Sequence, residues 1–128
     1  YSFSFSGLKT ALLYYSQKTN QDEFQSNISD IAASYQEAIL DCLFNALENL
    51  AIDYPEVKDI YISGGVAANN RLRVKSKQFE LDYRKNIILP KLEYCTDNAA
   101  MIAMAAYQKI INGQKSPYDL APIPNLKL

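Results

Sequence analysis

An apolar run that stops abruptly at two glycines is the feature that most limits how this chain can fold. Residues 59–62 read DIYI, Gly64 and Gly65 follow, and residues of helical composition begin immediately afterwards. An α/β protein uses a strand, a glycine turn and a helix in this order to bring backbone N–H groups and a helix N-terminus up to an anionic ligand. The run therefore predicts an α/β fold with a nucleotide or phosphorylated substrate at the turn. Taken alone, Gly64 and Gly65 also fit a tight strand-to-helix turn that binds nothing.

The complete absence of histidine excludes several chemistries. Neither a Ser-His-Asp or Cys-His nucleophile system nor a histidine-ligated zinc site can be assembled from these residues. Cys42 and Cys95 lie too far apart in the sequence for a metal-type pair, so we expect free, buried thiols in a reducing compartment. No signal peptide and no apolar run of membrane-spanning length is visible, which predicts a cytoplasmic protein without membrane contact.

The charge pattern gives no broad nucleic-acid-binding face. The net charge is −1 over 128 residues, and acidic and basic residues are mixed along most of the chain. One local basic cluster contains Arg71, Arg73, Lys75 and Lys77, and a solvated helix face is its ordinary interpretation. A chain of this length forms one domain at most, with a modest core.

The spacing of apolar residues predicts alternating strands and helices. The strands are expected at residues 1–5, 57–62 and 86–89. The helices are expected at residues 8–18, 27–52 and 67–84, with a last helix that begins at residue 96 or 97 and ends at about residue 112. We expect Ser26 or Asn27 to cap the second helix, the middle strand to be buried on both faces, and the apolar last helix to pack on two sides. Gly113 is a helix stop, so residues 1–113 form the predicted domain and residues 114–128 an extended tail.

Two polar side chains near helix starts are candidates for a site. Asn69 falls in the first turn after the glycines, where its amide can both donate to and accept from a nucleotide. Asp97 is either an ordinary helix cap or a carboxylate that faces a cleft and ligates a metal. A single carboxylate holds a metal weakly, so further ligands would have to come from elsewhere. Residues 6–10, SGLKT, lack the spacer and the second glycine of a phosphate-binding P-loop.

Together these segments resemble the C-terminal part of the TsaD family of tRNA threonylcarbamoyladenosine transferases, formerly called O-sialoglycoprotein endopeptidases or glycoproteases. Three blocks carry the resemblance, in the family's order and spacing: FSFSGLKTA at residues 3–11, GGVAAN at residues 64–69 with Leu72 and Arg73, and CTDNAAMIA at residues 95–103. They span nearly the whole chain, and their combination is highly specific.

The resemblance implies a partial actin-like ATPase fold, mainly its C-terminal lobe, with a nucleotide in the cleft between two lobes. It implies transfer of a threonylcarbamoyl group from threonylcarbamoyl-adenylate to N6 of adenosine 37 in tRNAs that read codons starting with A. It makes Asp97 a ligand of a divalent metal, iron or zinc, completed by two histidines of the N-terminal lobe. By the same resemblance, Asn69 contacts the nucleotide ligand, threonylcarbamoyl-adenylate or ATP, and Gly64 and Gly65 shape the turn beside its phosphates.

The resemblance also predicts partners and limits. We expect tRNA, a TsaB-like paralogue and a TsaE-like ATPase to act with the full-length enzyme. The N-terminal lobe is missing here, so we expect a C-terminal fragment that is inactive by itself and self-associates through exposed faces. We also expect Asn69 and Asp97 to face one crevice, while no side chain of this sequence is an obvious general base.

Three other functions remain open at this stage. A phosphotransferase or ATPase of the same fold class would suit the glycine turn, although residues 96–98 give no reason to prefer phosphoryl transfer. A zinc protease would require His-Glu-x-x-His or a similar motif, which this sequence does not contain. A noncatalytic pairing module is disfavoured by the presence of both Asn69 and Asp97.

Overall fold

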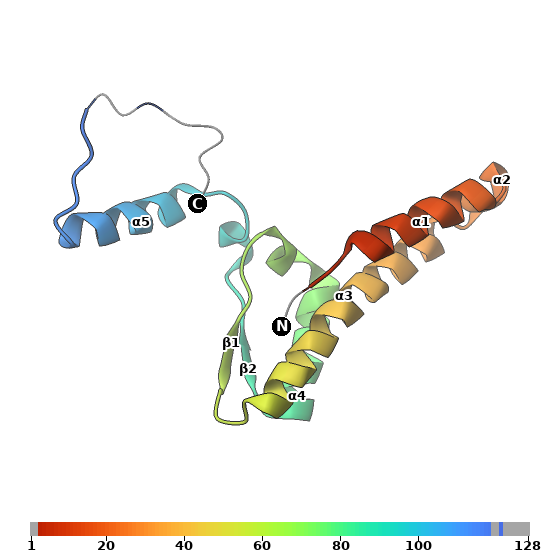
Figure 1. The fold of residues 1–128 in the computed structure, drawn as a ribbon, viewed down its shortest axis with the longest axis horizontal. Coiled ribbons are helices and arrows are strands. Elements are labelled where there is room, and N and C mark those ends of the chain that lie inside the picture. Colours follow the sequence, from red (N-terminus) through yellow and green to blue (C-terminus); the bar gives the residue numbers. More distant parts are fainter. Residues whose placement is uncertain (1–2, 119–120, 122–128) are drawn as a thin grey trace.

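The computed structural model describes residues 3–118 and 121 and shows helices arranged around a small parallel sheet (Figure 1). The elements follow in this order: α1 (Ser6–Lys18), α2 (Gln21–Ser26), α3 (Ile28–Asp53), β1 (Asp59–Tyr61), η1 (Gly65–Ala68), α4 (Asn70–Tyr83), β2 (Asn86–Ile88), η2 (Leu92–Tyr94) and α5 (Ala99–Ile111). In Figure 1, α1 runs alongside α3, α4 lies beside the sheet, and α5 extends away from the rest on the opposite side. Within residues 3–118 and 121, no helix combines the length and the apolar character needed to cross a membrane.

The two strands pair in parallel, with Ile60 opposite Ile87 at the centre of the register. Backbone bonds from Ile62 N to the Ile88 oxygen and from Asn86 N to the Lys58 oxygen continue the pairing at both ends. Parallel neighbours need a crossover connection, and here η1 and α4 supply it. The predicted α/β class is therefore confirmed, as a mostly helical structure with a small parallel sheet, whereas the described residues do not show the actin-like arrangement.

The core lies where α3, α4 and β2 meet. The rings of Phe44 on α3 and Phe79 on α4 pack with their centroids 5.9 Å apart, and Phe79 stacks on Tyr83 at 4.6 Å. Leu40 and Leu72 are fully buried beside them. These residues recur at helical spacing, so one face of each helix is apolar and burying that face stabilises the pair. The core thereby holds α4, and the turn before it, against the middle of α3.

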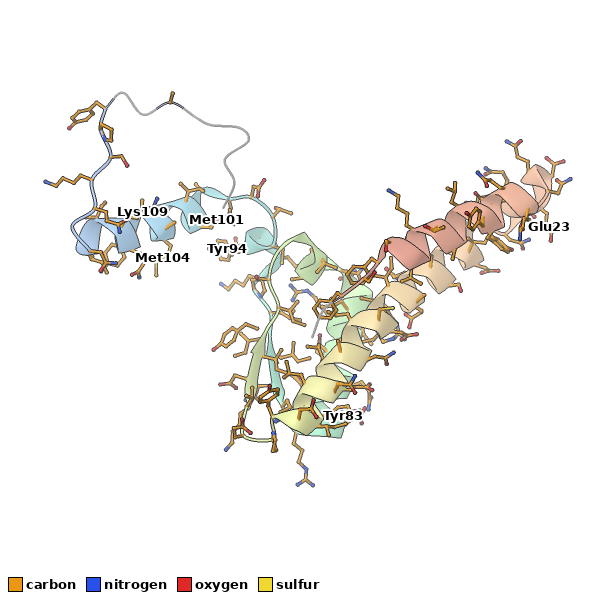
Figure 2. The ribbon with its side chains drawn as sticks, viewed as in Figure 1. Glu23, Tyr83, Tyr94, Met101, Met104 and Lys109 are labelled. Atoms are coloured by element: carbon orange, nitrogen blue, oxygen red, sulfur yellow. The ribbon has the colours of Figure 1, made fainter. Side chains whose placement is uncertain are left out.

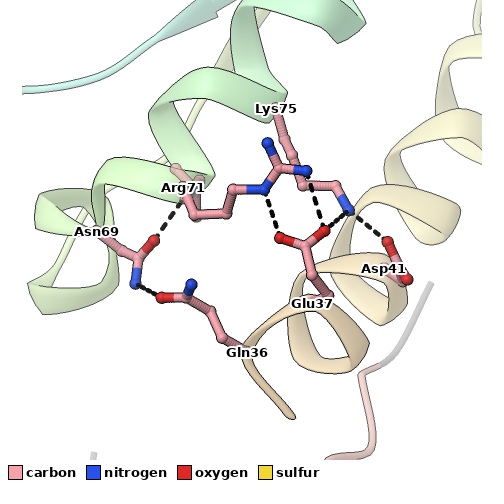
Figure 3. Close-up of polar contacts among 7 residues, drawn as sticks. Gln36, Glu37, Asp41, Asn69, Arg71 and Lys75 are labelled. Atoms are coloured by element: carbon pink, nitrogen blue, oxygen red, sulfur yellow. Dashed lines mark hydrogen bonds and ion pairs between the residues drawn. The ribbon is translucent and has the colours of Figure 1, made fainter. Parts of the chain in front are cut away.

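An ion-pair cluster on the surface joins α3 to the first half of α4 (Figure 3). Glu37 of α3 pairs with Arg71 through both of its oxygens and also accepts from Lys75 at 3.1 Å, while Lys75 reaches Asp41 as well. Hydrogen bonds from Arg71, followed by those from Lys75, lower the pKa of Glu37 from its ordinary 4.5 to about 2. Two of the four basic residues in the local cluster are thus paired with carboxylates of the same chain, which supports the interpretation as a helix face.

The buried Lys85, just after α4, bonds to the segment that connects α3 to β1. Arg84 adopts a left-handed conformation, with φ of 52°, and ends α4 so that Lys85 turns inward. Lys85 is 5% exposed, and its ammonium donates to the backbone oxygens of Tyr54 at 3.0 Å, Pro55 at 2.9 Å and Val57. These oxygens belong to the segment between α3 and β1, so Lys85 ties this connection to the end of α4 and supplies donors to its backbone carbonyl groups.

The predicted first strand is wrong for residues 3–5, which have no regular structure; residues 1 and 2 lie outside the described part. Phe5 instead takes a helical conformation at the start of α1, and its oxygen accepts from Lys9 N. Asn27 does not cap α3 with its side chain, because its amide donates to the oxygen of Glu23 in the helix before it. Residues 19 and 20 lead directly into α2, which Asn20 caps.

Two predictions of burial are also wrong for the described residues. In β1, Ile60 is half-buried but Tyr61 is 73% exposed, because α3 and α4 cover only one face of the two-stranded sheet. Along α5 no residue is buried, and Figure 2 shows Met101 and Met104 standing clear of the other elements. Gly113 does stop α5, with φ of 72° and a bond from Gln114 N to the Lys109 oxygen. The division at residue 113 stays a prediction.

The Glu37 carboxylate should make stability depend on pH in the acid range. Its pKa is depressed in the folded protein, so its contribution is present above the unfolded value of about 4.5 and is lost as the pH falls towards about 2. We expect Glu37→Gln to make the urea midpoint less dependent on pH between about pH 5 and pH 2. Glu56→Gln, at an exposed turn residue, is the control. Equal pH dependence of the Glu37→Gln and native proteins would contradict the ion-pair assignment.

Replacing Lys85 by methionine should destabilise the protein strongly. Methionine fills similar space but takes the lysine donor away from the backbone oxygens of Pro55 and Val57, while the Tyr54 oxygen still accepts from the N–H of Val57. The loss costs about 2–4 kcal/mol of unfolding free energy. Guanidinium denaturation of the intact protein measures the change. The matched control is Lys77→Met on an exposed position of α4. A loss below about 1 kcal/mol would show that these bonds contribute little.

Candidate functional site

The segments that carry the predicted site residues both follow the carboxyl ends of paired strands. Gly64 lies just after β1, and Asp97 lies in the segment after β2, beyond η2. Since β1 and β2 are parallel, the two segments start from the same edge of the sheet. In open α/β sheets, this is the edge at which ligands bind. The topology therefore brings these two parts of the sequence to one side.

The glycine turn is shaped by one strained position. Gly64 has φ of 86° and ψ of −178°, a conformation essentially restricted to glycine. Gly65 has no such requirement, and a side chain placed there would meet open space among the described residues. The turn does not lead straight into the predicted helix 67–84: η1 intervenes, and α4 starts at Asn70. The backbone N–H groups at the start of α4 are therefore displaced from the glycines by one short helical turn.

Asn69 is the N-cap of α4 rather than a residue of its first turn. Its side-chain oxygen accepts from Leu72 N at 3.0 Å, and its side-chain nitrogen donates to Oε1 of Gln36 at 2.8 Å (Figure 3). The oxygen of the Asn69 amide is therefore oriented by α4, and its nitrogen is oriented by α3. Gln36 is the residue that sequence reasoning missed. It lies 33 positions away in the sequence, on a helix predicted only for its packing, so no local motif pointed to it.

Asn69 and Gln36 line an open pocket of about 420 Å³ between α3, η1 and the helices at the N-terminal end. Its other lining residues are almost all apolar: Leu12, Phe24, Ile28, Ile31, Ala32, Tyr35, Ile39, Leu40 and Val66. A largely apolar pocket of this size with a few convergent polar groups is the usual form of a small-molecule site. Gly64, Gly65 and Asp97 are not among its lining residues.

The segment that carries Asp97 is fastened to α4 by Arg73. The guanidinium donates to the Pro90 oxygen at 2.8 Å and contacts the Cys95 sulfur at 3.5 Å. Cys95 is 2% exposed, and its thiol also lies 3.5 Å from the Lys91 oxygen. Both cysteines are free thiols, as predicted, but only Cys95 is buried, whereas Cys42 is half-buried. Arg73 lies one helical turn after Asn69, and its backbone N–H donates to the backbone oxygen of Asn69. The first turn of α4 thus contacts both the segment that follows the glycine turn and the segment that carries Asp97.

Asp97 is exposed and does not cap α5. Asn98 is the cap, since its side-chain oxygen accepts from Met101 N at 3.0 Å. The carboxylate of Asp97 is therefore not used by the helix. As an oxygen donor it suits a divalent metal as one ligand, but the described residues contain no group of three or more potential ligand side chains that could hold a metal ion. A metal at Asp97 would need ligands from outside this part of the chain.

Comparisons with known proteins agree with the motif pattern. The family model described as TsaD, tRNA N6-adenosine threonylcarbamoyltransferase, matches residues 1–104. Three relatives carry the name tRNA N6-adenosine threonylcarbamoyltransferase. The protein from Thermosipho africanus is 45% identical to this chain over 100% of its length, and the protein from Kosmotoga olearia is 44% identical over 100%. The protein from Fervidobacterium nodosum is 43% identical over 98% of this chain. The chain spans only 37–38% of the length of these relatives.

The family model covers most of the chain and includes the glycine turn, Asn69, Arg73 and Asp97. These are also the residues that the structure places at the carboxyl edge of the sheet or in the segments that leave it. Sequence and structure agree on this point, and the chain belongs to the TsaD family of tRNA N6-adenosine threonylcarbamoyltransferases.

Proposed function

We propose that this chain supplies the nucleotide-binding side of the catalytic site of a tRNA-modifying transferase. The enzyme would move a threonylcarbamoyl group from threonylcarbamoyl-adenylate to N6 of adenosine 37 in tRNAs reading codons that start with A. The observation that carries the proposal is the pocket that Asn69 lines, five residues after Gly64 in the segment that leaves the carboxyl edge of a parallel sheet. Because Gly65 has open space around it, a ligand could approach the backbone there.

The reaction requires the adenylate to be held while an amine attacks it. The N6 nitrogen forms a bond to the carbamoyl carbon, the bond from that carbon to the phosphate oxygen breaks, and AMP leaves as the N6 nitrogen loses a proton. Asn69 would hold the nucleotide portion, and the bare backbone of Gly64 and Gly65 would lie beside the phosphate. Such fixed contacts accelerate a transfer by keeping the reacting atoms in place.

Asp97 would supply one carboxylate ligand to a divalent iron or zinc ion, together with histidines of a preceding lobe. When bound, such an ion polarises the carbonyl group of the adenylate. The exposed carboxylate without a capping role supports this assignment. Arg73 would position Asp97, because it holds the segment that carries Asp97 against α4.

The exposed apolar faces support an assembly larger than this chain. Along α5, Ile102, Met104 and Ile110 are 63%, 57% and 69% exposed. Faces of this kind are normally covered by other protein. In the proposed cytoplasmic enzyme, the remainder of an actin-like fold, a TsaB-like paralogue, a TsaE-like ATPase and the tRNA itself would share this role. Inactivity and self-association of the isolated chain stay predictions.

Replacing Asp97 by alanine in the full-length protein should abolish the tRNA modification. The test uses cells whose own enzyme has been removed and measures threonylcarbamoyladenosine in their tRNA by mass spectrometry. We expect a loss of about 100-fold or more, because removing a metal ligand removes the proposed metal site. Asp30→Ala, at an exposed position on α3, is the matched control and should retain the product. Undiminished product in Asp97→Ala would overturn the ligand assignment.

Replacing Arg73 by methionine should loosen the Asp97 segment without unfolding the protein. The backbone N–H groups of Tyr94 and Cys95 are bonded within the 3₁₀ turn that Arg73 fastens. Losing a charged hydrogen bond should speed their hydrogen exchange by about tenfold. Exchange mass spectrometry of the full-length protein measures this, with Lys77→Met as the control. Unchanged exchange at Tyr94 and Cys95 would show that other contacts hold the segment.

A further inference from the structure

We propose that Gln36 is a positioning residue, which fixes the side-chain amide of Asn69 in the orientation that the nucleotide-bearing substrate requires. The inference rests on the proposed function, because it assigns a role to a second residue of the same pocket. Gln36 does not belong to any of the motifs that define the family resemblance. It enters only through the packing of α3 against the start of α4.

The hydrogen bonds determine which way both amides point. The backbone N–H of Leu72 can only donate, so the atom of Asn69 that faces it is the oxygen, at 3.0 Å. The nitrogen of Asn69 must then face Gln36, and Gln36 must present its oxygen, at 2.8 Å. A single backbone donor therefore sets the orientation of two side chains in turn, and Figure 3 shows the resulting bond between the amides of Asn69 and Gln36.

This arrangement leaves part of the Asn69 amide available to a ligand. The amide nitrogen carries two hydrogens and the oxygen has two lone pairs, and the bonds to Gln36 and Leu72 use one of each. One donor and one acceptor remain in a side chain that lines the 420 Å³ pocket. Without Gln36, the nitrogen would lose its fixed partner, and the amide would have to be ordered when the ligand binds.

Gln36 is itself held firmly. The next residue, Glu37, pairs with Arg71 and Lys75 of α4, and Leu40, one helical turn further on, is 2% exposed. Both contacts lie within the helical turn that follows Gln36, and they set the distance between α3 and the first half of α4 there. The side-chain oxygen of Gln36 thus reaches Asn69 from a rigid helix rather than from a loop, which is the condition for precise positioning.

The test compares four forms of the full-length protein: native, Gln36→Met, Asn69→Ser and the double variant. Methionine has similar length and no acceptor, and serine retains a helix-capping oxygen while removing the amide nitrogen. Isothermal titration calorimetry with ATP measures the dissociation constant of each form. We expect Gln36→Met to weaken ATP binding about three- to tenfold, the effect of one lost hydrogen bond. In the double variant, the Gln36→Met change should have no further effect beyond that of Asn69→Ser.

A spectroscopic measurement separates positioning from a purely structural role. The side-chain amide resonances of Asn69, assigned by their loss in Asn69→Ser, should shift in Gln36→Met. They should stay in place in the control Gln25→Met, which changes an exposed glutamine of α2. Thermal unfolding confirms that each variant is folded, and Gln36→Ala replaces Gln36→Met if the latter does not fold.

The outcomes distinguish failure of this inference from failure of the proposed function. Native ATP affinity in Gln36→Met alongside weakened affinity in Asn69→Ser would overturn the role of Gln36 and leave the nucleotide site in place. Additive losses in the double variant would overturn it as well, because Gln36 would then act independently of Asn69. Native ATP affinity and native tRNA modification in Asn69→Ser would overturn the assignment of Asn69 itself, and with it the proposed site.

Discussion

Parallel pairing of β1 with β2 is the constraint on which the candidate site depends. Two parallel strands direct their carboxyl ends to one edge, so the chain must cross back through η1 and α4 between them. The glycine turn and the Asp97 segment therefore leave from the same edge, although they are more than 30 residues apart in the sequence. Arg73 then bonds the second segment to α4 and maintains this proximity.

The contact between α3 and α4 is the second constraint on the candidate site. The Phe44–Phe79 pair and the buried Leu72 hold the helices together at their centre, and the ion pairs of Glu37 hold them at the surface. This contact brings Gln36 to Asn69 and forms one wall of the apolar pocket. The packing of α3 against α4 thus both stabilises the fold and determines the geometry of the candidate site.

Residues close together in the sequence determined most of what could be predicted. The periodicity of residues 27–52 identified α3, and the run before Gly64 identified β1. Burial was predicted less well because it depends on neighbours. Tyr61 belongs to a strand whose second face is uncovered, and Met101 belongs to a helix on which no residue is buried. Their apolar character indicates a covering surface that this part of the chain does not supply.

The sequence by itself determined the α/β class, the glycine turn and the identity of Asn69 and Asp97 as candidate residues, because local composition and spacing carry that information. Only the tertiary structure decided that Asn69 caps α4, that Asn98 rather than Asp97 caps α5, and that Gln36 is the partner of Asn69. A hydrogen bond between residues 33 positions apart arises from the packing of two helices, and no local pattern encodes it.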